Sequence, residues 1–107
     1  YCLSAHSAVG KMVGLSSDEI RDARLGRASD PKQDAILKLS TSIVEKRGFV
    51  GNDEIEAARN AGVTEAELTE IVANTALNLL TNYFNHVAET EVDFPAAEEL
   101  TSDSEEG

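Results

Sequence analysis

Residues 65–88 read EAELTEIVANTALNLLTNYFNHVA, and this stretch decides the fold. Its apolar residues recur at intervals of three and four, which is the spacing of a helix, and they form two stripes. The first stripe comprises Leu68, Val72, Ala76, Leu79 and Tyr83, and the second comprises Ile71, Leu77, Leu80, Phe84 and Val87. A single small neighbour cannot cover a helix that is apolar over most of its circumference. The sequence therefore predicts a homo-oligomer whose subunits meet through the 65–88 helix.

Four shorter helices are predicted before this one, and most have a recognisable start signal. Capping signals occur at Ser16 with Glu19, at Asp30 before Pro31, and at Thr64 with Glu67. Glycines that can end a helix follow the apolar patterns at Gly14, Gly26, Gly48 and Gly62. Together these signals predict helices over about residues 2–13, 17–25, 31–47, 52–61 and 65–88.

The composition also favours helices over a sheet. Aliphatic residues and alanine dominate, aromatic residues make up 5% of the chain, and tryptophan is absent. Both prolines, Pro31 and Pro95, stand at predicted element boundaries. At 107 residues the chain is long enough for one domain. We therefore predict an all-α helical bundle over residues 1–95.

Residues 96–107 form an acidic tail after this domain. The tail contains a single bulky apolar residue, Leu100, and several carboxylates: Glu98, Glu99, Asp103, Glu105 and Glu106. So little apolar surface cannot offset the entropy of ordering the chain. The tail alone is therefore expected to be disordered.

The charge of the chain argues against two classes of partner. The formal net charge is −11, and no basic stripe offsets it in the sequence. Such a chain repels phosphate backbones and anionic lipid surfaces, so neither nucleic acid nor membrane is expected as a partner. No apolar run approaches the roughly 20 residues of a membrane-spanning helix, and no signal-like segment is visible. The default compartment is the cytoplasm, where a lone thiol stays reduced.

Cys2 and His6 form the strongest candidate for a catalytic pair. Residues four apart share one face of a helix, so the His6 imidazole is expected to reach the Cys2 sulfur and to stabilise its thiolate. A thiol in the first helical turn also ionises more readily, because the unpaired N–H groups there favour negative charge. The pair continues the stripe of Val9 and Val13, so both side chains are expected to face packed protein. The structural alternative is a small buried cysteine and a histidine with ordinary helix contacts.

Weaker candidates lie near the end of the 65–88 helix. Asn82, Tyr83 and His86 are predicted as binding residues. The structural alternative is that His86 complements the helix dipole, while Asn82 and Asn85 bond neighbouring backbone. The thiol and the two histidines lack the paired short spacings of zinc sites, so no metal site is expected.

Two segments carry a resemblance to a known family. The order from Cys2 to His6 resembles the second half of the C-x-x-C-x-x-x-H motif of the alkylhydroperoxidase D and carboxymuconolactone decarboxylase superfamily. The runs LTNYFNHV at 80–87 and EVDFP at 91–95 are similar to the closing helix of its peroxidase-related branch. The resemblance implies an alkylhydroperoxidase D-like bundle that lacks its N-terminal part. We therefore expect a preceding segment, with a cysteine two residues before Tyr1 and a proton-relay glutamate on an earlier helix.

The resemblance implies a thiol-dependent peroxidase that reduces small organic hydroperoxides. The Cys2 thiolate would attack the O–O bond and become a sulfenic acid, while His6 stabilises the thiolate and protonates the departing oxygen. The upstream cysteine would then close a disulfide, and an external dithiol reductant, a lipoamide-type or thioredoxin-like protein, would reopen it. This chemistry requires no bound metal, haem or flavin.

Two other classes of function stay open from the sequence. A carboxymuconolactone decarboxylase-like lyase would use acid and base residues on a small lactone acid and would not need Cys2. A non-enzymatic helical oligomerisation module would keep an unreactive Cys2 and an intact oligomer. Activity in a Cys2→Ser protein would favour the lyase, and labelling with a thiol probe across pH would separate the module from both enzymes.

Overall fold

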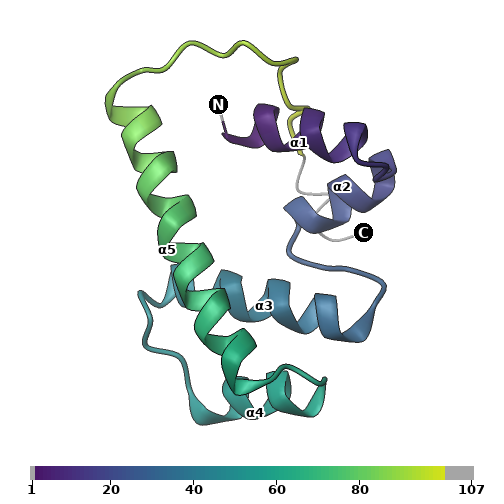
Figure 1. Cartoon of the computed structure of the whole chain (residues 1–107), viewed down its shortest axis with the longest axis vertical. Coiled ribbons are helices and arrows are strands. Elements are labelled where there is room, and N and C mark those ends of the chain that lie inside the picture. Colours follow the sequence, from purple (N-terminus) through teal and green to yellow (C-terminus); the bar gives the residue numbers. More distant parts are fainter. Residues whose placement is uncertain (1, 101–107) are drawn as a thin grey trace.

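The computed structural model describes residues 2–100, so Tyr1 and residues 101–107 lie outside the described part. Within this part the chain forms five α-helices and no strand, which confirms the predicted all-α class. The helices, labelled in Figure 1, are α1 (Cys2–Met12), α2 (Ser17–Arg24), α3 (Pro31–Glu45), α4 (Asn52–Asn60) and α5 (Glu65–Val87). Most of the acidic tail falls outside the described residues, and residues 96–100 of it form no helix.

The predicted capping signals begin α2 and α5. The Glu19 N–H donates to Ser16 Oγ and the Ser16 N–H donates to Glu19 Oε1, each at 3.0 Å. Thr64 and Glu67 form the same reciprocal pair, at 3.1 and 3.0 Å. Each pair satisfies two backbone donors that a helix start leaves without a partner.

The start of α3 also agrees with the sequence, whereas its end differs. The Gln33 N–H donates to Asp30 Oδ2 at 2.9 Å, as expected for an N-cap. The helix ends at Glu45 rather than near Gly48. Arg47 already adopts a left-handed φ of 55°, and the N–H of Gly48 bonds back to the Ile43 carbonyl at 2.9 Å. The chain therefore turns before the glycine that marks the end in the sequence.

The buried core lies among α3, α4 and the first half of α5. Its buried members are Leu39, Ala58, Val63 and Ile71, and partly buried neighbours pack around them: Ile36, Ile43, Val50, Ile55 and Leu68. Among the described helices, α3 contacts both α4 and α5. This group is small because the second half of α5 extends beyond it (Figure 1).

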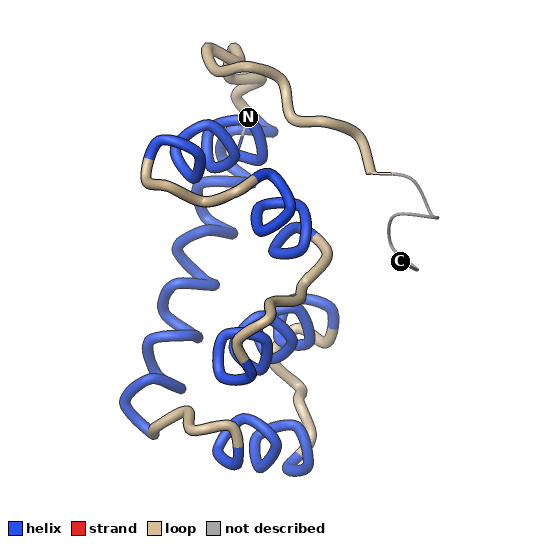
Figure 2. Tube along the Cα trace, turned by 90° about the vertical axis from the view of Figure 1, so that its right-hand side faces the viewer, coloured by secondary structure: helices blue, strands red, loops and turns tan. Residues whose placement is uncertain are grey.

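A second group consists of α1, α2 and the segment that follows α5. Helix α1 packs on α2, and Gly10 is buried where they meet, since a Cβ there would lie 3.4 Å from side-chain atoms of Ile20 and Leu15. After α5 the chain crosses back to α1, as Figures 1 and 2 show. The N–H of Ala97 donates to the hydroxyl of the buried Ser4 at 2.9 Å. The C-terminal segment is thereby attached to the helix that carries Cys2.

The apolar faces of α1 and α5 are largely uncovered in the single chain. The sequence stripe of α1 was expected to be packed, yet Val9, Met12 and Val13 are exposed. On α5, Ile71 is buried, whereas the following residues are exposed: Val72, Leu77, Leu80, Tyr83, Phe84 and Val87. Residues 65–87 are helical, as their spacing predicts, but Ile71 is the only apolar residue of α5 that is fully buried.

The length and hydropathy of each helix show whether it could cross a membrane. None of the helices described within residues 2–100 combines enough length and apolar character to span a bilayer.

Candidate functional site

Cys2 lies in the first turn of α1, where the sequence predicts it, and its side chain is half-buried. The Nδ2 amide group of Asn85, on the last turns of α5, donates to the Cys2 sulfur at 3.7 Å. These two residues are 83 positions apart in the sequence, so the contact depends on how the two helices are brought together. A hydrogen-bond donor at this place stabilises negative charge on the sulfur.

A polar cavity of about 350 Å³ opens beside the thiol. Its lining consists of Cys2, Asn82, Asn85, His86, Glu89 and Thr90. All of these except Cys2 come from the end of α5 and the two residues that follow Ala88. The cavity therefore presents one nucleophile, one imidazole, two amides and one carboxylate to any small molecule that enters it.

The structure does not pair Cys2 with His6. Both lie on α1, but His6 is exposed and is not part of the cavity lining. Within residues 2–100 the sulfur accepts its hydrogen bond from Asn85, and none is formed with His6. The prediction that thiol and ring both face packed protein therefore fails for the ring. The reason is that α2, the end of α5 and the C-terminal segment all contact α1 but leave His6 exposed.

The residues predicted at the end of α5 fall in two groups. Asn82 and His86 line the thiol cavity, so the fold joins them with Cys2 in one site. Tyr83 is 60% exposed and lies outside the lining. This difference follows from helix geometry, because positions 82, 85 and 86 share a face that position 83 does not.

Asn85 is the residue whose role the sequence analysis missed. The structural alternative was that Asn82 and Asn85 bond neighbouring backbone. Side-chain bonds to the backbone are instead formed by Asn74 and Asn78, whose amides donate to the carbonyls of Glu70 and Asn74. The Asn85 amide instead reaches Cys2. The available signal was the spacing of two asparagines and a histidine on one helical face, which is a polar patch at the end of an otherwise apolar helix.

Among the described residues, no group of three or more histidine, cysteine, aspartate or glutamate side chains is arranged to hold a metal ion. Cys2, His86 and Glu89 line the same cavity, but their side chains are not arranged as a group that could hold a metal ion.

Comparison with known proteins returns no match: no family model, no curated protein and no solved structure is similar enough to this chain to be reported. The resemblance to the alkylhydroperoxidase D and carboxymuconolactone decarboxylase superfamily thus rests on the residues of the two quoted segments. The fold and the cavity define an all-helical protein with a half-buried thiol at a polar site.

Proposed function

We propose that the protein is a thiol-dependent peroxidase that reduces small organic hydroperoxides through Cys2. One observation carries this proposal: the only thiol of the chain is half-buried, accepts a hydrogen bond from Asn85 and opens into a cavity that His86 also lines. A nucleophilic thiol, a group that supports its negative charge and an imidazole that can exchange protons are the parts that peroxide reduction needs.

In the proposed reaction, the Cys2 thiolate attacks one oxygen of the hydroperoxide and the O–O bond breaks. The sulfur becomes a sulfenic acid and is oxidised by two electrons, and the other oxygen leaves as an alkoxide. A proton from an imidazole converts the alkoxide to an alcohol. We assign this proton to His86 rather than His6, because His86 lines the same cavity as the sulfur and His6 does not.

An external dithiol would then restore the enzyme. One of its thiols condenses with the sulfenic acid, which releases water and forms a mixed disulfide, and its second thiol displaces Cys2 by exchange. A lipoamide-type or thioredoxin-like protein belongs to this chemical class. We place the reaction in the cytoplasm, where such reductants are kept in the dithiol form.

The proposal is tested by following oxidation of Cys2 directly. Protein exposed to cumene hydroperoxide in the presence of dimedone is expected to gain one dimedone adduct at Cys2 by intact mass, and Cys2→Ser is expected to consume no hydroperoxide. His86→Gln should slow adduct formation by about a hundredfold, which is the scale of general acid catalysis, whereas His6→Gln should change it little. The two histidine variants are matched controls for each other.

Two results would contradict this assignment. Hydroperoxide consumption that persists in Cys2→Ser would remove the thiol mechanism. Slow adduct formation in His6→Gln, together with an unchanged rate in His86→Gln, would show that His6 is the proton donor.

A second proposal concerns assembly, and the exposed apolar side chains favour it. Phe84 and Leu80 are 68% and 66% exposed on α5, and Met12 is 82% exposed on α1. Exposed apolar side chains that follow one another along a helix, as Leu80 and Phe84 do, are typical of protein interfaces. We therefore propose a homo-oligomer that buries the second half of α5.

A further inference from the structure

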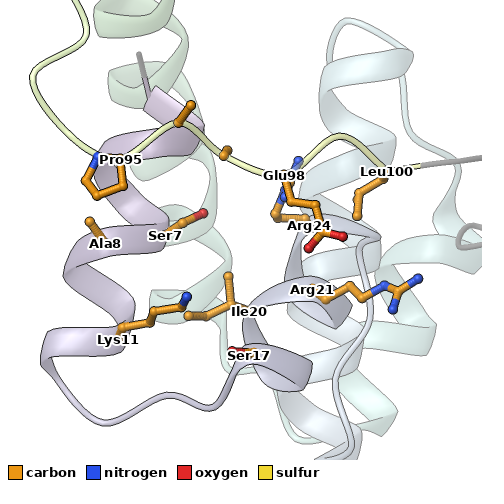
Figure 3. Close-up of a pocket in the computed structure, with 12 residues that line it drawn as sticks. Ser7, Ala8, Lys11, Ser17, Ile20, Arg21, Arg24, Pro95, Glu98 and Leu100 are labelled. Carbon is orange, nitrogen blue, oxygen red and sulfur yellow. The ribbon is translucent and has the colours of Figure 1, made fainter.

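A second cavity, separate from the thiol site, lies between α1, α2 and the C-terminal segment. Its volume is about 230 Å³, and Figure 3 shows the side chains that line it. Helix α1 contributes Ser7 and Lys11, helix α2 contributes Ile20 and Arg24, and residues 95–100 close the remaining side. The hydrogen bond from Ala97 to the buried Ser4 holds that side in place. The inference drawn from this cavity does not depend on the chemistry of Cys2.

Among the described residues, two cations of this cavity have no carboxylate partner, unlike most cations of the chain. Other lysines and arginines are ion-paired with carboxylates: Arg27, Lys32, Lys38, Lys46 and Arg59. Within residues 2–100, Lys11 and Arg24 form no such pair. The Nε of Arg24 is moreover buried and has no hydrogen-bond partner in the described part of the chain. A buried donor without an acceptor is unfavourable, so an acceptor brought by a ligand would be stabilising.

The arrangement of the lining side chains separates charge from apolar surface. In Figure 3 the Lys11 side chain extends from α1 toward Ile20, and the Ser7 hydroxyl points toward α2. The Glu98 carboxylate points from the C-terminal segment toward α2, and the Arg21 guanidinium points away from α1. Ala8, Ile20 and Pro95 supply apolar surface between these groups.

We propose that this cavity binds a small organic monocarboxylate. Its carboxylate would accept hydrogen bonds from the Arg24 guanidinium, whose planar donors match a carboxylate, with the Lys11 ammonium as a second positive charge. Its short aliphatic part would lie against Ala8, Ile20 and Pro95.

The charges of the cavity favour a single negative charge on the ligand. Arg21 also lines the cavity, but its guanidinium points away from α1 and has an interaction of its own. The other two cations, Lys11 and Arg24, form no ion pair within residues 2–100 and share the cavity with one carboxylate, that of Glu98, which leaves one positive charge to be balanced. A dianion such as inorganic phosphate would be repelled by Glu98 and by the overall charge of −11. A neutral molecule of the same shape would leave the buried Nε of Arg24 without an ionic acceptor.

The test is a titration of the full chain followed by two-dimensional NMR, with sodium hexanoate as the probe. The Nε–H signal of Arg24 and the backbone signals of Ser7 and Ile20 are expected to shift and saturate. Hexanamide, which has the same shape without the charge, and inorganic phosphate serve as comparison ligands and should each bind at least about tenfold more weakly than hexanoate.

Variants assign the interaction to the proposed side chains. Arg24→Gln should weaken hexanoate binding by about tenfold or more, which is the scale of a charge-assisted hydrogen bond, and Glu98→Gln should strengthen it. Arg47→Gln is the matched control, because Arg47 is an exposed arginine outside this cavity. Far-ultraviolet circular dichroism of each variant shows whether a loss of binding comes from a loss of folding. Lys11→Gln is a second test of binding, at an exposed residue whose replacement should not affect folding.

Three results would overturn the proposal. Equal binding of hexanamide and hexanoate would remove the role of the charge. Tighter binding of phosphate would contradict the monocarboxylate class. Equal affinities of Lys11→Gln and Arg47→Gln for hexanoate, both unchanged from the parent chain, would show that the carboxylate does not bind beside α1.

Discussion

Glu54 links the end of α3 to the start of α4 through hydrogen bonds to both of its oxygens. Its Oε1 accepts from the Ser42 hydroxyl at 2.6 Å and from Lys46 Nζ at 2.9 Å, and its Oε2 accepts from the Gly51 N–H at 2.9 Å. These donors, with the Ser42 hydroxyl first, lower the pKa of Glu54 from 4.5 to about 2. The charged form is therefore the one that the fold stabilises.

The lowered pKa of Glu54 makes stability depend on pH in a defined window. Because the pKa is lower in the folded protein than in the unfolded chain, the stabilisation is complete above about pH 4.5 and is lost as pH falls toward about 2. Glu54→Gln keeps the shape and an acceptor oxygen but removes the charge. We expect it to lower stability to urea at pH 7, and the gap to the parent chain should close between about pH 4.5 and 2.

The control for this experiment is Glu91→Gln, at an exposed glutamate for which no ion pair is found within residues 2–100. The charged partner of Glu54 is itself half-exposed, so added salt should narrow the difference at pH 7. A constant difference between Glu54→Gln and the parent chain from pH 7 to pH 2 would show that the charge is not what matters.

At the same scale, the sequence identified part of the candidate site. It selected Cys2, Asn82 and His86, which the fold brings to one cavity. It assigned His6 to the thiol because a spacing of four places two residues on one side of a helix. That spacing does not say which side is covered by the rest of the chain. The partners of the sulfur come from α5, and this contact over 83 positions has no local sequence signal.

At the scale of the helices, the starts of α2, α3 and α5 could be predicted because their signals are local. A capping side chain bonds a backbone N–H only three residues ahead. The spacing of the two residues in the sequence is therefore enough to predict the hydrogen bond and the start of the helix. The end of α3 could not be placed as well. Left-handed backbone at Arg47 ends the helix early, and such a conformation at a residue other than glycine has no strong sequence signature.

The cap of α5 gives a prediction about helix stability. Thr64→Ala removes the hydroxyl that accepts from the Glu67 N–H and should lower the free energy of unfolding by about 1 kcal/mol. Thr69→Ala is the matched control. Thr69 lies on the same helix, and its hydroxyl only donates to the carbonyl of Glu65, so its replacement should have little effect. Urea unfolding followed by circular dichroism measures both, and equal losses would contradict a capping role for Thr64.

At the scale of the whole molecule, the buried core is small for the length of apolar helix that the chain contains. Of the two stripes on α5, only Ile71 is buried, in the core that it shares with residues of α3 and α4. The residues from Leu77 to Val87 and the apolar residues of α1 are mostly exposed. The sequence could predict that one neighbour is insufficient for α5. The sequence could not predict which surface covers the remaining apolar residues of α5. A periodic pattern shows which residues share a face of the helix but does not identify what packs against that face.

The proposed homo-oligomer leads to a prediction for Phe84, which is 68% exposed in the single chain. If α5 is buried between subunits, Phe84→Asp places a charge without a partner in an apolar interface, which is strongly unfavourable. The parent chain should then sediment with an apparent mass above its 11.5 kDa, and Phe84→Asp should sediment at about the mass of one chain. Because the core around Leu39 is formed within one chain, the variant should stay helical.

Thr69→Asp is the control for this variant, since it adds the same charge to an exposed position of α5 before its uncovered apolar part. It should keep the mass of the parent chain. Hydroperoxide consumption then separates assembly from chemistry. The cavity lining of Cys2 and residues 82–90 lies within one chain, so a monomeric Phe84→Asp protein should still form the sulfenic acid at Cys2. A parent chain that sediments as a stable monomer would instead show that its exposed apolar surface serves no assembly of identical subunits.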